Sequence, residues 1–302
     1  TESADASLVL QVEVFDEAAN SAGAMATVTV AARTVTSLTS EPASELHPTW
    51  SPDGQRLAFQ ADRDEGHYDL WMMDADGANA TRLTSNVNED ENPAWSPDGD
   101  WIAFDSDRAG NYDLWRLPIA GGEAGVEALT VANNDDRMPT FNSDGSRIYF
   151  SSNRGSGLFF NIWSIAAAGG DSLLVTAYDA DDIAPALAPS DLALAFVTTL
   201  ALVTDHVYVV DLVSTATAPL TGDVGFVEAD PVWAPDGTSL LFSRGTATHT
   251  NLWLMRPGDG APSQVTFGTG TIGDGGAAWS PDGERIAFHS DRNGNPDIFV
   301  LE

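Results

Sequence analysis

The hydrophobic and polar positions of this chain form a pattern that repeats six times. Each copy holds a short run of alternating apolar residues, a polar turn, and a second apolar run. The turn motif Trp-Ser-Pro-Asp-Gly is intact at 50–54, 95–99 and 279–283, altered at 141–145 and 233–237, and reduced to Leu-Ala-Pro-Ser-Asp at 187–191. Successive motifs begin 45 or 46 residues apart. A period in this range, with strand–turn–strand punctuation, is typical of a β-propeller.

The turn motif and the runs that follow it predict four strands in each copy. Pro presets φ at the second turn position, Asp bonds its own backbone, and Gly accepts a positive φ. In the second copy a polar loop at 106–111 leads to a third strand at 112–115, and a weaker fourth strand ends near 129–130. Six units of four antiparallel strands predict an all-β fold, a six-bladed β-propeller over residues 34–302.

The two ends of the propeller sequence complement each other. The last copy stops at 297–301, after its third strand, and the segment 34–39 precedes the first copy. Thr39 lies eleven residues before Trp50, as Thr84 lies before Trp95. We therefore expect 34–39 to supply the fourth strand of the last blade, which closes the ring and removes its open edges.

Residues 1–33 do not fit the repeat. Alternating, β-branched runs at 7–14 and 26–30 flank turn residues at 16–23, which predicts a β-hairpin. The pair resembles the last two strands of a bacterial immunoglobulin-like domain, but about 30 residues are too few for a sandwich. Because an isolated hairpin is marginal in water, we expect it to pack on the propeller, on upstream sequence, or on another molecule.

Four short motifs, taken in order, make the repeat specific. Trp-Ser-Pro-Asp-Gly, Ile-Ala-Phe, Ser-Asp-Arg and Asp-Leu-Trp together resemble the six-bladed propeller repeats of the TolB family, over residues 34–302. The resemblance implies a periplasmic or cell-surface interaction module, although similar propellers stand beside hydrolase domains in prolyl oligopeptidase-like enzymes. TolB carries a different N-terminal domain, so the resemblance does not transfer a particular partner.

Charge narrows the classes of partner. The chain has 45 acidic and 13 basic side chains, all of them Arg, for a net charge of −32. Such a surface repels nucleic acid and anionic membranes and favours cations or basic partners. There is no Cys, so thiol catalysis and disulfides are excluded. No apolar run approaches the roughly 20 residues that span a bilayer, so we expect no membrane span.

An acidic residue stands five positions before every turn motif. The six carboxylates belong to Glu45, Asp90, Asp136, Asp182, Glu228 and Asp274. They enter the inner strands, so we expect a ring near one mouth of the channel. One interpretation is a metal site, because Ca²⁺ prefers six to eight oxygen ligands. The other is pairing with arginines of the following loops, namely Arg63, Arg108, Arg154, Arg244 and Arg292. In the fourth copy Leu200 takes the arginine position.

Other features give little support for catalysis. The five histidines stand at different repeat positions, and no Gly-x-Ser-x-Gly motif is present. The third-strand aromatics Trp71, Trp115, Trp163, Trp253 and Phe299 are expected to pack between blades. The apolar loop at 200–202 is either a contact surface or packs locally.

Together these patterns favour a non-enzymatic interaction protein, secreted, at the cell surface or in the periplasm. The chain begins with Thr, so we expect a processed or trimmed polypeptide. Its partner is expected to be another protein, or copies of itself added through the hairpin at 1–33 to form a fibre or array. The alternatives are the substrate-binding propeller of an enzyme and a calcium-dependent adhesin.

Overall fold

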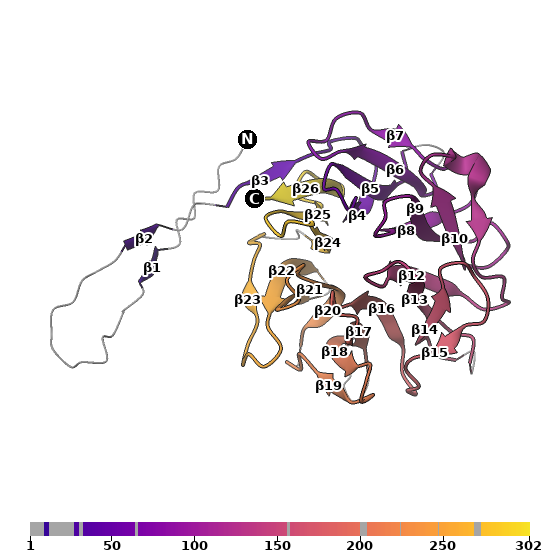
Figure 1. Cartoon of the computed structure of the whole chain (residues 1–302). Coiled ribbons are helices and arrows are strands. Elements are labelled where there is room, and N and C mark those ends of the chain that lie inside the picture. The colour runs from indigo at the N-terminus through magenta and orange to yellow at the C-terminus, as the bar shows by residue number, and fades with distance from the viewer. Residues whose placement is uncertain are drawn as a thin grey trace.

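The computed structural model describes residues 9–11, 27–29, 33–63, 66–155, 158–199, 204–223, 225–246, 248–268 and 273–302. Six antiparallel sheets of four strands stand like blades around a central axis (Figure 1). The predicted all-β, six-bladed propeller is therefore confirmed. Within the described residues the helical structure consists of one 3₁₀ turn, η1 (Gly122–Gly125), in the second blade.

Each blade is built from an inner strand at the channel, two middle strands and a short outer strand. The inner strands are β4 (Glu45–Trp50), β8 (Asp90–Trp95), β12 (Asp136–Phe141), β16 (Asp182–Leu187), β20 (Val227–Trp233) and β24 (Asp274–Trp279). The second strands are β5 (Arg56–Ala61), β9 (Trp101–Ser106), β13 (Arg147–Ser152), β17 (Ala193–Thr198), β21 (Leu240–Thr246) and β25 (Ile286–Ser290).

The outer half of each blade follows the same order. The third strands are β6 (Asp69–Asp74), β10 (Asp113–Pro118), β14 (Asn161–Ala166), β18 (His206–Asp211), β22 (His249–Met255) and β26 (Asp297–Leu301). The outer strands are β7 (Thr81–Arg82), β11 (Glu127–Ala128), β15 (Leu173–Leu174), β19 (Thr217–Pro219), β23 (Ser263–Gln264) and β3 (Val35–Ser37). We call the side where the inner strands begin the carboxylate face, and the opposite side, with the repeated turns, the turn face.

The repeated turn motif is held by its own side chains. In the first blade the Ser51 hydroxyl donates to Asp53 at 2.6 Å and accepts from the backbone N–H of Arg56 at 2.9 Å. Gly54 has φ of 66°, a conformation that residues with a Cβ adopt at a cost. The motif therefore fixes the angle between the inner and second strands of a blade.

Strand β3 completes the last blade, as the sequence predicts. It pairs with β26, with Val35 opposite Leu301. Next to it, the Thr39 hydroxyl accepts a hydrogen bond from the backbone N–H of Ile298 at 2.9 Å. Thr84 makes the equivalent contact in the first blade, with Leu70 at 3.0 Å. The N-terminal segment thus reproduces both the strand pairing and the threonine hydrogen bond of a fourth strand.

The core lies between the blades. One phenylalanine on the second strand of every blade is fully buried: Phe59, Phe104, Phe150, Phe196, Phe242 and Phe288. The third-strand aromatics join the same clusters; Trp115, for example, packs with Ala58 and Leu70 of the preceding blade. Their predicted role in packing between blades is confirmed.

Two sequence predictions fall on residues that the structure describes only in part or not at all. Within 1–33, β1 (Val9–Gln11) and β2 (Thr27–Thr29) pair antiparallel as a hairpin would. The immunoglobulin-like resemblance of this segment stays a prediction. The apolar loop at 200–202 lies outside the described residues. Among the residues that are described, no helix has the length and apolar character to cross a membrane.

Candidate functional site

All six predicted carboxylates are buried at the carboxylate face, with 0 or 1% of their surface exposed. Four of them form close ion pairs with the loop arginine of their own blade. Arg63 Nε donates to Glu45 Oε1 at 2.7 Å and Arg292 Nη2 to Asp274 Oδ1 at 2.8 Å. The other two close pairs are Arg154 with Asp136 and Arg108 with Asp90.

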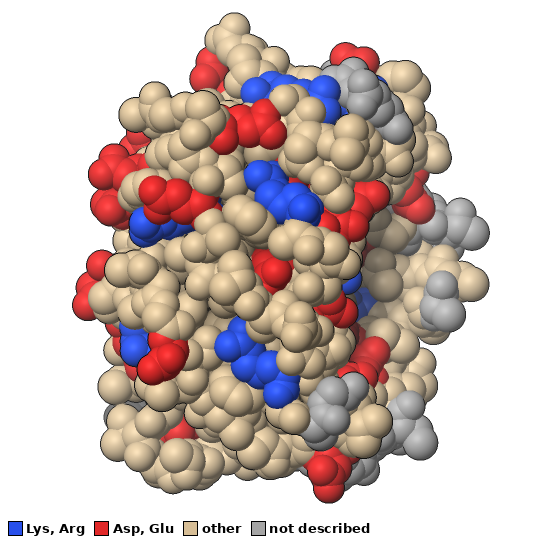
Figure 2. Space-filling view, turned by 90° about the vertical axis from the view of Figure 1, so that its right-hand side faces the viewer, with Lys and Arg blue, Asp and Glu red and all other residues tan. Residues whose placement is uncertain are grey.

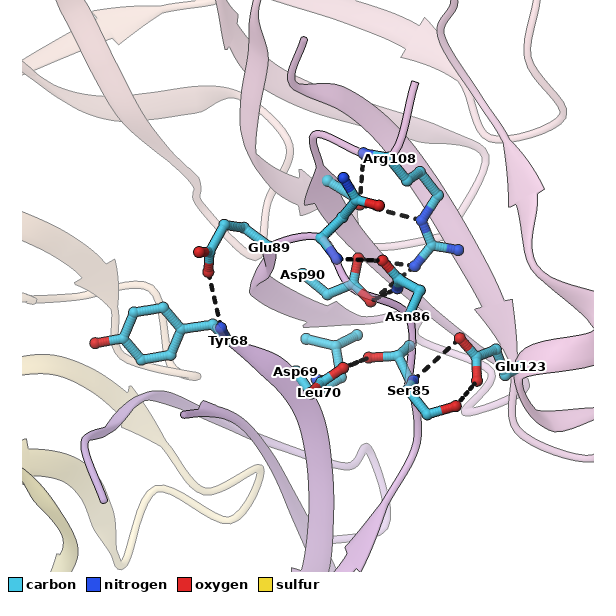
Figure 3. A network of polar contacts seen from close by, with 12 residues as sticks. Tyr68, Asp69, Leu70, Ser85, Asn86, Glu89, Asp90, Arg108 and Glu123 are labelled. Carbon is cyan, nitrogen blue, oxygen red and sulfur yellow. Dashed lines mark hydrogen bonds and ion pairs between the residues drawn. The ribbon is translucent and has the colours of Figure 1, made fainter. Parts of the chain in front are cut away.

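The second blade shows the arrangement in detail (Figure 3). Arg108 Nη2 lies 2.7 Å from both Asp90 oxygens, and Asn86 Nδ2 donates to Asp90 Oδ2 at 2.6 Å. The guanidinium also lies over two rings, Phe104 at 5.2 Å and Trp115 at 5.1 Å. The arginine therefore joins the buried acid to the aromatic core by an ion pair and by cation–π attraction.

Threonines at the ends of the outer strands link the carboxylates to the preceding blades. Thr221 donates to Glu228, across the boundary between the fourth and fifth blades. At the ring closure, burial raises the pKa of Glu45, and the hydroxyl of Thr39 and the charge of Arg63 oppose that rise. The six carboxylates thus lie at joints between blades.

Backbone contacts strengthen the same joints. The N–H of Tyr68 in the first blade donates to Glu89 Oε2 of the second at 2.7 Å (Figure 3). The N–H of Tyr112 makes the equivalent bond to Asp135 Oδ1 at 3.2 Å. Arginines also lie beside acidic side chains on the outer surface, where Figure 2 shows them in small separate patches.

Two blades depart from the pattern. Arg244 binds Asp223 at 2.5 Å and lies 3.7 Å from Glu228, whose other contacts include the backbone N–H of Val207 at 3.2 Å. In the fourth blade, burial raises the pKa of Asp182 to about 6, and the hydroxyls of Thr176 and Thr198 oppose the rise. Neither Asp182 oxygen has a hydrogen-bond partner of normal geometry within the described part of the chain.

The raised pKa of Asp182 predicts a pH-dependent cost. The folded state binds the proton of the Asp182 carboxyl more tightly than the unfolded state does. The stabilisation from this protonation is therefore fully present below about pH 4 and is lost as pH rises through about 6. Asn does not ionise, so Asp182→Asn avoids this loss. The unfolding free energy of Asp182→Asn minus that of the parent should therefore increase by about 1–3 kcal/mol from pH 4 to pH 7, measured by urea titration.

Asp90→Asn is the matched control for Asp182→Asn. It breaks a close ion pair and leaves Arg108 without its carboxylate, so it should destabilise the fold at neutral pH. A stability difference between Asp182→Asn and the parent that stays constant from pH 4 to pH 7 would contradict the assignment.

The carboxylates are not brought together around one point. Among the described residues, no group of three or more His, Asp or Glu side chains is arranged to hold a metal ion. Four of the six have an arginine within 2.8 Å, which competes for the same oxygens. Calcium binding by Glu45, Asp90, Asp136, Asp182, Glu228 and Asp274 stays a prediction.

A second repeated feature lies two residues after each carboxylate. Every inner strand has a β-bulge there, and the residue in the bulge has a φ between 49° and 56°. The six bulge residues are His47, Asn92, Met138, Ala184, Asp230 and Gly276. A positive φ costs about 1 kcal/mol for residues other than glycine, and bulges redirect side chains. Such positions often occur at functional sites.

Bulge residues from four blades line a cavity of about 340 Å³ in the central channel. The fourth blade contributes an apolar wall of Ile183, Ala184 and Val197. Polar groups complete the lining, among them Asp205 of the fourth blade and His47, Asp230 and His289 of other blades. A mainly apolar cavity with a few convergent polar groups is the usual form of a ligand site.

The two channel histidines face each other. The rings of His47 and His289 are 5.4 Å apart and edge to face, and His289 Nδ1 accepts from the backbone N–H of His47 at 3.5 Å. A Cβ on Gly276 would lie 2.6 Å from His289 Nδ1, so the glycine makes room for the ring. Although His289 keeps some surface open to the channel, desolvation and His47 lower its pKa. The imidazole is therefore uncharged at neutral pH and can accept a hydrogen bond.

Between the second and third blades the polar side chains form hydrogen bonds and ion pairs with one another. Arg137 donates to Asp105 at 3.0 Å and to Glu91 at 2.5 Å, and lies 3.8 Å from the Tyr112 ring centroid. Asn92 donates to Asp105 at 2.9 Å, and burial raises the pKa of Asp105 to about 7. This network joins the second and third blades and leaves the histidine side of the channel as the more open one for a ligand.

Sequence reasoning found the carboxylates and missed the channel. The carboxylates are one residue type at one phase of the repeat, whereas the bulge positions hold six different residues. A usable signal was present, because five of the six bulge residues stand immediately before a proline (Pro48, Pro93, Pro139, Pro185 and Pro231).

Fold and site together define a closed six-bladed β-propeller with buried acidic joints and a lined central channel. The family model of the TolB beta propeller domain matches residues 17–204 and 183–302. The chain therefore belongs to the TolB β-propeller family, as its motifs indicate. A comparison with curated proteins gave no match.

Several solved structures share the fold. A putative TolB from Agrobacterium tumefaciens has a TM-score of 0.69 at 17% identity, covering 89% of this chain and 96% of that one. TolB from Acinetobacter baumannii has a TM-score of 0.62 at 18% identity, covering 73% of this chain; the match spans about half, 53%, of that protein. An oligogalacturonate lyase in complex with manganese has a TM-score of 0.62 at 16% identity, covering 89% and 93%. At these identities the likeness shows the fold alone.

Proposed function

We propose that this propeller is a protein-binding module, secreted or exposed in the cell envelope, and that it binds its partner with the carboxylate face. The resemblance to TolB, whose family works in the periplasm or at the cell surface, supports the location. The observation that carries the binding face is the distribution of exposed apolar side chains.

Five large apolar side chains among the described residues are more than 70% exposed. Four of them, Val87, Val131, Leu158 and Phe267, stand on loops of the carboxylate face. The fifth, Val213, stands on the turn face. Exposed apolar side chains gathered on one face of a soluble domain are typical of a contact surface. With a net charge of −32, the complementary partner surface is neutral or basic at its rim.

Capture of the partner from an envelope extract tests the binding face. We expect the parent chain to retain a partner that Phe267→Ser and Val131→Ser bind about tenfold more weakly, since each loses an exposed apolar contact. Val213→Ser is the matched control, because it removes a comparable side chain from the turn face. If all three variants captured the partner equally well, the carboxylate face would not be the binding surface.

The partner can also be a second copy of this chain, through strand addition by residues 1–33. Negative-stain images of the parent chain and of a chain without residues 1–33 separate the two cases. Fibres or arrays that persist after the deletion would remove the hairpin from the proposal.

One observation favours a second candidate, the substrate-binding propeller of an enzyme. The channel cavity holds a histidine pair and Asp230 beside an apolar wall, and the lowered pKa of His289 keeps its imidazole uncharged as a hydrogen-bond acceptor there. Turnover in an activity screen that disappears in His289→Gln would replace the binding proposal with this one.

A further inference from the structure

On the turn face, an arginine of one blade covers the tryptophan of the next. Arg56 lies 5.3 Å from the ring centroid of Trp95, and Arg285 lies 4.4 Å from that of Trp50. Each arginine stands three positions before the buried phenylalanine of its second strand, and each tryptophan ends an inner strand. Arg285 also donates to the carbonyl of Gly54 at 3.3 Å. Within the described residues, a guanidinium thus covers this ring at two of the four boundaries where the inner strand of the next blade ends in tryptophan.

In the fourth blade this arginine is missing. Ala193 stands three positions before Phe196, and the tryptophan of the next blade is Trp233. The two turns still meet at the same spacing as elsewhere. A Cβ on Gly237 would lie 3.8 Å from Pro189, compared with 3.6 Å for Gly54 and Pro281. The boundary between the fourth and fifth blades therefore has the same turn spacing but no arginine at position 193.

The space that the arginine would fill is an open groove of about 510 Å³ between the fourth and fifth blades. Trp233 and Met255 lie along it, and the small side chains Ala193, Ala216 and Ala218 leave it wide. The fifth blade also lacks the arginine and has Ser239 at its position, but there the larger Leu254 takes the place of Val209 and packs in the same cluster as Trp279.

Two exposed carboxylates line the groove, Asp211 and Asp259. The backbone N–H and hydroxyl of Ser214 lower the pKa of Asp211, which keeps it ionised at neutral pH. The described residues that line the groove include no Arg or Lys. Trp233 is 8% exposed, as is Trp95, and a guanidinium lies over the equivalent ring at two other boundaries of this propeller.

We propose that this groove binds an arginine side chain of a protein partner. The guanidinium stacks on Trp233, the aliphatic stem packs between Met255 and the alanines, and Asp211 and Asp259 balance the charge. Arginine fits better than lysine because its planar, weakly hydrated head stacks on rings. The site lies towards the turn face and does not depend on the partner proposed for the carboxylate face.

A capped tripeptide, acetyl-Gly-Arg-Gly-amide, is the probe. Its titration is followed by the indole N–H signals in NMR spectra, with Trp233 assigned from a Trp233→Phe variant. We expect a saturable shift of the Trp233 signal at millimolar peptide. The same peptide with citrulline, which keeps the shape without the charge, should bind about tenfold more weakly. Equal binding of the citrulline peptide would overturn the proposal, as would the absence of a shift with the arginine peptide.

The variant Ala193→Arg supplies the missing cation from within the chain. It should abolish peptide binding, raise the melting temperature, and shift the Trp233 signal as the peptide does. Leu192→Arg is the matched control, because it adds the same charge at an exposed neighbour and should leave peptide binding intact. Peptide binding by Ala193→Arg at the parent affinity would overturn the proposal.

A further variant keeps the test valid if Ala193→Arg folds poorly. Asp259→Asn retains the groove and removes one charge, so it should weaken the arginine peptide about threefold to tenfold. Guanidinium ion that binds as tightly as the peptide would contradict an arginine side chain as the occupant, because the ion lacks the aliphatic stem.

Discussion

Replacing Arg108 by Ala should lower the free energy of unfolding by about 3–5 kcal/mol. The substitution leaves Asp90 fully buried without its counter-ion, because the Asp90 side chain is 0% exposed and both its oxygens face the guanidinium. It also removes the cation from over Phe104 and Trp115. Denaturant titration at neutral pH measures the loss.

Glu127→Ala is the control for Arg108→Ala, because Arg116 itself also lies 4.3 Å from the Trp101 ring centroid and donates to the carbonyl of Ala167. Glu127 pairs with Arg116 and is 55% exposed, and pairs of this kind contribute at most about 1 kcal/mol. Equal losses in the two variants would show that the buried position of Asp90 adds nothing, and would contradict its role at the blade joint.

Removing residues 1–39 should open the ring and cost about 3–6 kcal/mol. The deletion takes away β3, whose ladder with β26 ends the last blade, and Leu38, which packs into the core of the first and last blades. It also leaves the N–H of Ile298 without the Thr39 hydroxyl that accepts its hydrogen bond. Thermal unfolding and denaturant titration both report the change.

A shorter deletion separates closure from the hairpin. Removing residues 1–32 keeps β3 and Thr39, so the unfolding free energy of the propeller should stay within about 0.5 kcal/mol of the parent value. If both deletions gave the same stability, β3 would not be the element that closes the ring.

The repeat predicted features whose residue types recur at one phase of each copy. The Ser-Pro-Asp-Gly turns, the third-strand aromatics that pack between blades and the threonine phase that placed Thr39 in the last blade are features of this kind. The carboxylates belong with them, because each fills the same joint. In the fourth copy the strands and Asp182 could be predicted, although the turn motif is reduced to Leu-Ala-Pro-Ser-Asp.

The side chains of the channel were not predicted from the repeat because they face a cavity and not a neighbouring blade. Packing therefore imposes no common residue, and His47 and Gly276 can hold the same position. The pairing of His47 with His289 also joins two different phases of the repeat, a bulge and a second strand. The groove at Trp233 was hidden for another reason: Ala193 is informative only once Arg56 and Arg285 are seen to reach the next blade.

At the bulges of the inner strands the backbone conformation is the same in every blade, while the side chain differs from blade to blade. The same left-handed conformation accepts histidine, asparagine, methionine, alanine, aspartate and glycine, while the acidic joint two residues earlier holds the blades together. Four of these positions line the channel cavity, and a library randomised at 47, 138, 184 and 230 would change the recognition chemistry of the channel on the same scaffold, whereas Gly276 leaves room for the His289 ring.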